Sequence, residues 1–222
     1  MADHLSGTDE RAVHWESIYG RNSADSVSWY QPEPVMSLEI LDMLGVTQDA
    51  GVIDIGGGAS TLVDALTQRG FTDLTVLDIS DTALQASRKR LGTQARVTWI
   101  ATDLLTWEPT RLYDVWHDRA VFHFLSGSEV ETYRDVLHRA IGPGGFVIMA
   151  TFAPEGPERC SGLPVTRYGA DELGSTLGTD FKVVEQRREV HTTPGGGVQP
   201  FTWIAAYRTL SDSQRQDLSR LK

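Results

Sequence analysis

The sequence predicts an α/β fold in which one seven-stranded sheet is mostly parallel, ends in an antiparallel C-terminal hairpin and carries helices on both faces. The first observation is that strand-like apolar segments alternate with helical segments between residues 52 and 151. This alternation is typical of parallel strands joined by crossover helices. The second is that residues 181–190 and 201–207 are strand-like, and the connection between them is too short for a crossover helix. We therefore expect these two strands to pair antiparallel.

Composition limits the class of protein and its partners. The chain of 222 residues is 40% hydrophobic and 23% charged, as expected of one soluble globular domain with a substantial core. A formal net charge of −10 argues against a nucleic-acid partner, because such proteins carry clustered Lys and Arg. No apolar run suits a signal peptide or a membrane span. The single cysteine, Cys160, is typical of a reducing environment, so we expect a cytoplasmic protein.

The N-terminal region predicts two helices ahead of the first strand. Residues 1–12 are polar and are expected to be mobile, whereas apolar residues recur on one side over residues 13–19. That spacing predicts a short helix. Pro34 is suited to begin a second helix, which carries an apolar stripe and ends at Gly45.

The most informative stretch is residues 52–60, where a short strand runs into three consecutive glycines and a helical pattern follows over residues 61–67. The glycines are Gly56, Gly57 and Gly58. Glycine lets the backbone turn tightly and approach a ligand closely. Either Ser60 or Thr61 is expected to cap the helix. A strand, a glycine turn and a helix in this order predict a nucleotide-type pocket at the carboxyl end of a parallel strand.

The spacing of the glycines distinguishes between two kinds of nucleotide site. A dinucleotide site prefers three spaced glycines, but Thr61 stands where the third would be. The better match is acidic-x-Gly-x-Gly, here Asp54-Ile55-Gly56-Gly57-Gly58. This stretch resembles motif I of the class I S-adenosylmethionine-dependent methyltransferases, although Ser60 replaces a glycine that the family usually has. The resemblance implies a Rossmann-like fold, S-adenosyl-L-methionine as the methyl donor and S-adenosyl-L-homocysteine as its product.

A second acidic residue, Asp78, ends the predicted strand 74–78 and lies 20 residues beyond Gly58. This architecture places a carboxylate there for the ribose hydroxyls. The alternative is that Asp78 caps the helix that follows. Since Ser80 or Asp81 is equally suited to cap that helix, we favour the ribose role.

A third acidic residue, Asp103, follows the predicted strand 97–101. The resemblance implies that Asp103 accepts a hydrogen bond from the adenine amino group and that Leu104 lines the ring. Acidic residues thus follow three successive strands, which is a stronger indication than any one of them. The residues expected to bind the cofactor are Trp29, Asp54, Gly56, Gly57, Gly58, Asp78, Ile79, Thr102, Asp103, Leu104 and Asp118.

The fourth predicted strand, residues 113–118, is expected to end beside the reactive methyl group. The candidate catalytic residues there are Asp118, Arg119 and His123. Arg119 either binds an acidic acceptor or pairs with Asp118. His123 is either a general base, because its usual pKa lies near neutrality, or a packed histidine. The Asn-Pro-Pro-Tyr motif of related amide and adenine methyltransferases is absent.

The rest of the chain predicts the remaining elements. Helices are expected over residues 129–140 and 170–177, and a buried strand over residues 146–151. The Gly-Pro-Gly-Gly turn at residues 141–145 resembles the segment before strand five of the class I enzymes. Residues 152–168 are rich in Pro and Gly, so we expect an irregular loop over the site. The tail at residues 211–222 is polar and is expected to fray.

These observations predict a single methyltransferase domain over residues 1–222, with a cofactor-binding core at 50–152. Residues 13–45 are expected to form N-terminal lid helices, and residues 153–208 the acceptor-side loop, helix and hairpin. The segment around Trp29 either packs as a lid or folds over the cofactor, as such segments do in the family that the sequence resembles.

The predicted activity is methyl transfer to a small-molecule thiol, carboxylate, hydroxyl or amine. In layout the chain is similar to the thiopurine, tellurite and halide methyltransferases. The alternatives are a protein lysine methyltransferase, which leaves a protein acceptor possible, and a binding module without catalysis. A nicotinamide-dependent oxidoreductase is disfavoured by the glycine spacing. We expect no metal site, because the histidines lack ligand spacing, no nucleic-acid or membrane partner, and a monomer or a homodimer.

Overall fold

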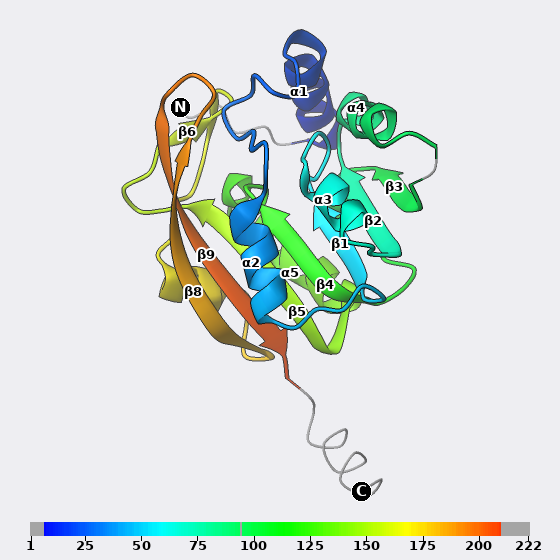
Figure 1. The fold of residues 1–222 in the computed structure, drawn as a ribbon. Helices are drawn as coiled ribbons and strands as arrows, with labels where there is room; N and C mark the ends of the chain where they lie inside the picture. Colours follow the sequence, from blue (N-terminus) through cyan, green and yellow to red (C-terminus); the bar gives the residue numbers. More distant parts are fainter. Residues whose placement is uncertain (1–6, 94, 210–222) are drawn as a thin grey trace, which may run out of the picture.

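The computed structural model describes residues 7–93 and 95–209. Seven strands of this part of the chain form one sheet in the order β3-β2-β1-β4-β5-β9-β8 (Figure 1). Strands β1 to β5 are parallel, and β9 runs antiparallel to both β5 and β8. The predicted sheet and its C-terminal hairpin are therefore confirmed. The strands are β1 Gly51–Ile55, β2 Asp73–Asp78, β3 Val97–Ala101, β4 Tyr113–Arg119, β5 Ile141–Phe152, β8 Phe181–Thr192 and β9 Val198–Arg208.

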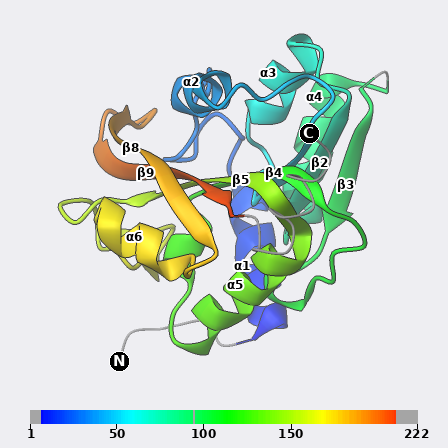
Figure 2. The same ribbon diagram turned by 90° about the horizontal axis from the view of Figure 1, so that it is seen from below.

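Helices cover both faces of the sheet (Figure 2). One face carries α2 (Val35–Met43), α3 (Leu62–Gln68) and α4 (Asp81–Leu91), and the other carries α5 (Ser128–Ala140) and α6 (Ala170–Thr176). Successive residues of a strand point to opposite faces. In β4, Val115 therefore packs in the core on the α2 side, whereas Trp116 packs in the core against α5. By the same alternation, Asp118 and Arg119 at the end of β4 point to opposite faces of the sheet.

Helix α1 (Thr8–Arg21) lies beyond the carboxyl ends of the central strands (Figure 1) and packs against α4. It begins at Thr8, ahead of the start at residue 13 that the apolar spacing predicted. The acidic side chains of Asp9 and Glu10 lie in the first turn, where negative charge complements the helix dipole. The helix therefore begins with a polar turn that precedes its apolar stripe.

The turn expected at residues 141–145 lies inside β5. Ile141 pairs with Tyr113, and the register then shifts so that Phe146 pairs with Val115. Gly144 has a φ of 85°, a conformation that glycine adopts readily. The segment is therefore an irregularity within a strand, and not a separate turn before it.

The segment 152–168, expected to be irregular, contains a small antiparallel hairpin of β6 (Arg159–Cys160) and β7 (Leu163–Pro164). Ser161 and Gly162 turn it, both with positive φ. The last hairpin is also longer than expected, because β8 and β9 extend to Thr192 and from Val198. The expected fraying of residues 211–222 lies outside the described residues. No helix within the described ranges is long and apolar enough to cross a membrane.

Candidate functional site

Two adjoining cavities lie at the carboxyl edge of the central strands. The first measures about 850 Å³, including space open to solvent, and the second about 550 Å³. Gly56, Trp29 and Arg119 line both. The first also contacts Asp78, Ile79, Asp103 and Leu104, and the second contacts Asp54 and Gly57. Crevices outside the carboxyl ends of parallel strands are where such sheets bind ligands.

Asp78 lies at the end of β2 with 5% of its surface exposed. Its Oδ2 accepts a hydrogen bond from the Gly58 amide at 2.9 Å, and its Oδ1 accepts one from the Ser80 amide at 2.8 Å. Burial raises the pKa of this carboxyl to about 7, against the opposing effect of these two amides. Ser80 caps α4 by accepting a hydrogen bond from the Ala83 amide at 3.1 Å, so Asp78 is not needed for that purpose.

Asp103 follows β3 and is held by Arg11, a residue that was not among the predicted site residues. The guanidinium of Arg11, on α1, donates from Nε and Nη2 to Oδ2 of Asp103 at 3.2 and 2.7 Å. Its Nη1 donates to Glu129 on α5 at 2.7 Å. Arg11, Trp15 and Tyr19 are spaced four residues apart and line the first cavity. That helical spacing is the signal that could have identified Arg11.

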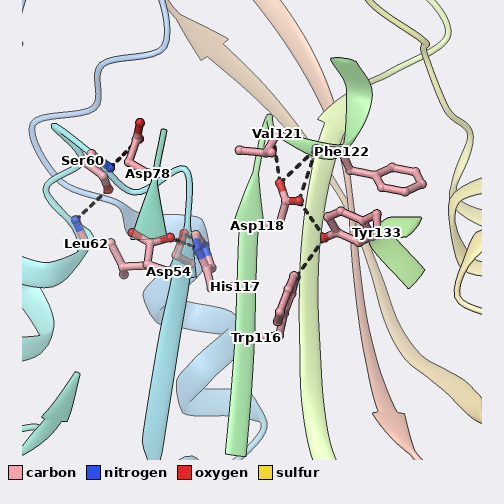
Figure 3. Close-up of polar contacts among 12 residues, drawn as sticks. Asp54, Ser60, Leu62, Asp78, Trp116, His117, Asp118, Val121, Phe122 and Tyr133 are labelled. Atoms are coloured by element: carbon pink, nitrogen blue, oxygen red, sulfur yellow. Dashed lines mark hydrogen bonds and ion pairs between the residues drawn. The ribbon is translucent and has the colours of Figure 1, made fainter. Parts of the chain in front are cut away.

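Asp54, at the end of β1, is joined to a buried histidine (Figure 3). Its Oδ1 lies 2.7 Å from Nδ1 of His117, and Nε2 of that ring lies 2.9 Å from the hydroxyl of Ser37 on α2. The other carboxylate oxygen, Oδ2, is buried and has no partner among the described residues. Asp54, His117 and Ser37 all line the second cavity, so this oxygen is available to a ligand.

The glycines bring the backbone close to these carboxylates. A Cβ atom at Gly57 would lie 2.6 Å from Cγ of Asp54, and one at Gly58 would lie 2.6 Å from Cβ of Ala83. Gly56 has a φ of 64°. Ser60, the first of the two expected caps, accepts a hydrogen bond from the Leu62 amide at 3.0 Å (Figure 3).

Asp118 points away from both cavities. Because side chains alternate along β4, Asp118 shares a face with Trp116 and is fully buried against α5. Its carboxylate accepts hydrogen bonds from the Tyr133 hydroxyl at 2.7 Å and from the Val121 amide at 2.9 Å (Figure 3). Burial raises its pKa to about 6. The side chain thus holds the turn after β4, and it does not pair with Arg119.

His123 also lies outside the lining of the cavities. It is fully buried between the rings of Phe124 and Phe152, with centroids 4.5 and 4.8 Å away. Its Nδ1 accepts a hydrogen bond from the Phe152 amide at 3.4 Å. Burial, with a smaller contribution from the charge of Arg119, lowers the pKa of His123 to about 3. Its place in the fold is that of a packed, neutral histidine, the second of the two alternatives.

Arg119 is the expected catalytic residue that does face the cavities. Its guanidinium lies over the ring of Phe201 at 4.5 Å, and its Nη1 donates to the Trp29 carbonyl at 2.9 Å. The Nε and Nη2 atoms are buried and have no partner among the described residues. Burial lowers the pKa of Arg119 from its usual value.

Aromatic rings from the N-terminal segment close one side of the first cavity. Trp15 contacts Trp29 edge-to-face at 5.9 Å and Phe124 at 5.2 Å, and Tyr19 contacts Trp29 at 6.0 Å. These four rings and Cys160 all line the cavity. The structure thus gathers eight of the expected cofactor-binding residues around the two cavities: Trp29, Asp54, Gly56, Gly57, Asp78, Ile79, Asp103 and Leu104.

The other three expected residues, Gly58, Thr102 and Asp118, support the site from outside the cavity lining. Gly58 donates its amide to Asp78, and the Thr102 amide donates to the Asp78 carbonyl at 3.0 Å. No group of three or more His, Cys, Asp or Glu within residues 7–93 and 95–209 is arranged to hold a metal ion.

Comparison with known proteins identifies related folds. Residues 52–145 match the family described as "Methyltransferase domain". A malonyl-[acyl-carrier protein] O-methyltransferase of Ilyobacter polytropus is 21% identical over 141 residues, which cover 61% of this chain. The match covers 54% of that relative, so the chain spans about half of its length.

Solved structures of methyltransferases share the fold over most of the chain. One from Anabaena variabilis superposes with a TM-score of 0.73 at 17% identity, covering 89% of this chain and 95% of that one. A Burkholderia thailandensis 1,6-didemethyltoxoflavin N1-methyltransferase, with bound 1,6-didemethyltoxoflavin and S-adenosylhomocysteine, gives a TM-score of 0.69 at 20% identity. It covers 95% of this chain and 94% of that one.

Proposed function

We propose that this chain, whose residues 52–145 match the methyltransferase family and whose fold is that of solved methyltransferases, transfers a methyl group from S-adenosylmethionine to a small-molecule acceptor. The released product is S-adenosylhomocysteine. The observation that carries the proposal is the set of three carboxylates, at the ends of β1 and β2 and just after β3, that meet at one edge of the sheet around adjoining cavities. The acceptor classes are a thiol, a carboxylate, a hydroxyl or an amine.

The residues present fit this cofactor by their chemistry. The Asp78 carboxylate, fixed by the amides of Gly58 and Ser80, retains lone pairs for two ribose hydroxyls. Asp103 and Leu104 are suited to the adenine amino group and ring. The unpartnered Oδ2 of Asp54 is suited to the ammonium group at the amino-acid end. Gly56 and Gly57 leave room where a Cβ would intrude on Val121 and Asp54.

The reaction needs little covalent chemistry from the protein. The bound donor supplies a methyl group already activated by a positively charged sulfur. The chain's own side chains then supply orientation and exclude water, which together account for large rate effects. Trp15, Trp29 and Phe124 form the apolar wall that does this. The same wall favours a small acceptor over the alternative of a protein lysine, because α1 and Trp29 lie across the first cavity.

The proposal is tested by incubating the protein with S-adenosylmethionine and a panel of small thiols, carboxylic acids, alcohols and amines, and by mass spectrometry of the products. We expect one chemical class to gain a methyl group, with equivalent formation of S-adenosylhomocysteine. Asp78→Ala should abolish most of this turnover, and Asp73→Ala, at the half-buried start of the same strand where it pairs with Arg111, should not. If histone-like or other lysine peptides are methylated and no small molecule is, the protein-acceptor alternative replaces the proposal. If the protein binds the cofactor and methylates nothing, the non-catalytic alternative does.

A further inference from the structure

We propose that the acceptor is a small carboxylic acid with an apolar, aromatic body, held by Arg119, and that the methyl group is transferred to its carboxylate oxygen to form a methyl ester. This inference rests on the proposed methyltransferase function and names the substrate class of the same site.

The guanidinium of Arg119 has hydrogen-bond donors that no described residue satisfies. Its Nη1 is satisfied by the Trp29 carbonyl at 2.9 Å, but the buried Nε and Nη2 donors have no partner among the described residues. An unpaired buried charge is costly unless a counterion is supplied. The Nε–H and Nη2–H groups of one guanidinium form a fork that matches the two oxygens of a carboxylate. The side chain is therefore suited to receive an anion.

Two carboxylates on the neighbouring elements, Glu189 and Asp118, form hydrogen bonds with other residues. Glu189, on β8, accepts hydrogen bonds from Gln31 at 2.7 Å and from the indole of Trp203 at 2.8 Å. Asp118 is held by Tyr133 on the opposite face of the sheet. Neither forms an ion pair with Arg119, although the charges of Glu189 and Asp54 act on it and oppose the lowering of its pKa by burial. Its Nε and Nη2 donors are therefore still without a hydrogen-bond partner among the described residues.

The guanidinium of Arg119 lies among residues of the C-terminal strands. It stacks on Phe201 of β9 at 4.5 Å, and its charge also acts on Cys160 of β6 and His191 of β8. These elements belong to the C-terminal part of the chain, outside the strands that carry the three cofactor-site carboxylates. Arg119 lines both cavities, and in the first it shares the lining with Trp15 and Trp29. We assign the acceptor to that aromatic wall.

The lining of the first cavity also limits which acceptors can be deprotonated there. Thiols, alcohols and ammonium groups must lose a proton before or during methylation, which calls for a general base. The first cavity has no suitable base among its described lining residues. Burial raises the pKa of Cys160 to about 11 and that of Tyr19 well above its usual value. Asp78 and Asp103 are tied to backbone amides and Arg11, and His123 lies outside the lining.

A carboxylic acid removes the need for that base, because it is already ionised at neutral pH. In the transfer, a lone pair of one carboxylate oxygen forms the new O–CH3 bond. The S–CH3 bond breaks and its electron pair stays on sulfur, so the products are a neutral ester and a neutral thioether, and no proton is released. The fork occupies one lone pair on each oxygen and leaves a second for the attack. Loss of the negative charge then weakens the hold of Arg119 on the product.

The test uses the full-length protein saturated with S-adenosylhomocysteine. Benzoate, 2-naphthoate and indole-3-acetate are titrated by calorimetry, each beside its neutral amide. We expect at least one carboxylate to bind, Arg119→Met to weaken it by at least about tenfold, and the amides to bind weakly to both proteins. Arg119→Lys, which keeps the charge without the fork, should be intermediate. Arg69→Met, at an exposed arginine paired with Asp42, is the matched control and should behave as the wild type.

With S-adenosylmethionine present, the carboxylate that binds should yield a methyl ester that mild alkali hydrolyses. The inference is overturned if none of the three carboxylates binds, if Arg119→Met leaves their affinity unchanged, or if methylation occurs at another atom. It is also overturned if Arg119→Met weakens S-adenosylhomocysteine but not 5′-methylthioadenosine, since Arg119 would then hold the carboxylate of the donor. Failure of the wild-type protein to bind S-adenosylhomocysteine would instead refute the proposed function itself.

Discussion

Nδ1 of His117 lies 2.7 Å from Oδ1 of Asp54, so a buried histidine on β4 fixes the carboxylate that ends β1. The ring also reaches the Ser37 hydroxyl at 2.9 Å, which joins α2 to the same chain of contacts. With one oxygen held in this way, the other, Oδ2, is buried without a partner among the described residues, and Asp54 lines the second cavity. His117 is thus a positioning residue for Asp54.

Replacing His117 should cost stability because it leaves a buried carboxylate without its partner. We expect His117→Phe to lower the free energy of unfolding by about 2–4 kcal/mol, measured by urea denaturation. Ser37→Ala removes only the outer hydrogen bond and should cost about 1 kcal/mol. Equal effects of the two substitutions would contradict the role assigned to the His117–Asp54 contact.

Asp78 should make stability fall as the pH rises towards neutrality. Its pKa is raised in the folded protein to about 7 by burial, so between about pH 4 and pH 7 the folded state binds more protons than the unfolded state. Asp78→Asn removes this titration. From about pH 5 to pH 8, the variant should gain roughly 1–3 kcal/mol relative to the wild type, as measured by urea unfolding at each pH.

Burial also raises the pKa of Asp118, to about 6, so this carboxyl likewise makes stability fall as the pH rises. Because the wild type and Asp78→Asn both contain Asp118, the difference between their free energies of unfolding reports on Asp78. A difference between the two proteins that does not change with pH would show that Asp78 is ionised over the whole range.

Much of the fold and part of the site follow from the sequence alone. The three acidic residues were predictable because the carboxyl ends of parallel strands share one edge of a sheet. What each carboxylate contacts was not predictable, since Asp54 meets His117 and Asp103 meets Arg11, partners separated by 63 and 92 residues. The orientation of Asp118 was predictable from the sequence, because successive residues of a strand point to opposite faces and Asp118 therefore points away from Arg119.

The contact between Arg11 and Asp103 should hold α1 over the first cavity. The two donors of Arg11 lie 3.2 and 2.7 Å from Oδ2 of Asp103. Arg11→Ala should weaken S-adenosylhomocysteine binding by roughly 5- to 30-fold, or about 1–2 kcal/mol, mainly through faster dissociation in stopped-flow measurements. Arg21→Ala, at the exposed end of the same helix, serves as the control. A similar rate of S-adenosylhomocysteine dissociation from Arg11→Ala and Arg21→Ala would contradict the role assigned to the Arg11–Asp103 contact.

Gly58 should not tolerate a side chain. A Cβ there would lie 2.6 Å from Cβ of Ala83 and would also meet the Asp78 carboxylate. We expect Gly58→Ala to lower the free energy of unfolding by about 1–3 kcal/mol and to weaken cofactor binding, because Asp78 must move. Gly20→Ala, where a Cβ would meet nothing within 4 Å, should be neutral or slightly stabilising. Thermal unfolding with and without S-adenosylhomocysteine measures both effects.

The most direct measurement is a calorimetric titration of the full-length protein with S-adenosylhomocysteine and, in parallel, with NAD. The carboxylates at the ends of β1 and β2 and just after β3 predict saturable binding of S-adenosylhomocysteine at one site per chain, and no binding of NAD. Asp78→Ala should weaken that binding by about 1.5–3 kcal/mol. Binding of NAD in preference, or the absence of any S-adenosylhomocysteine binding, would contradict the account.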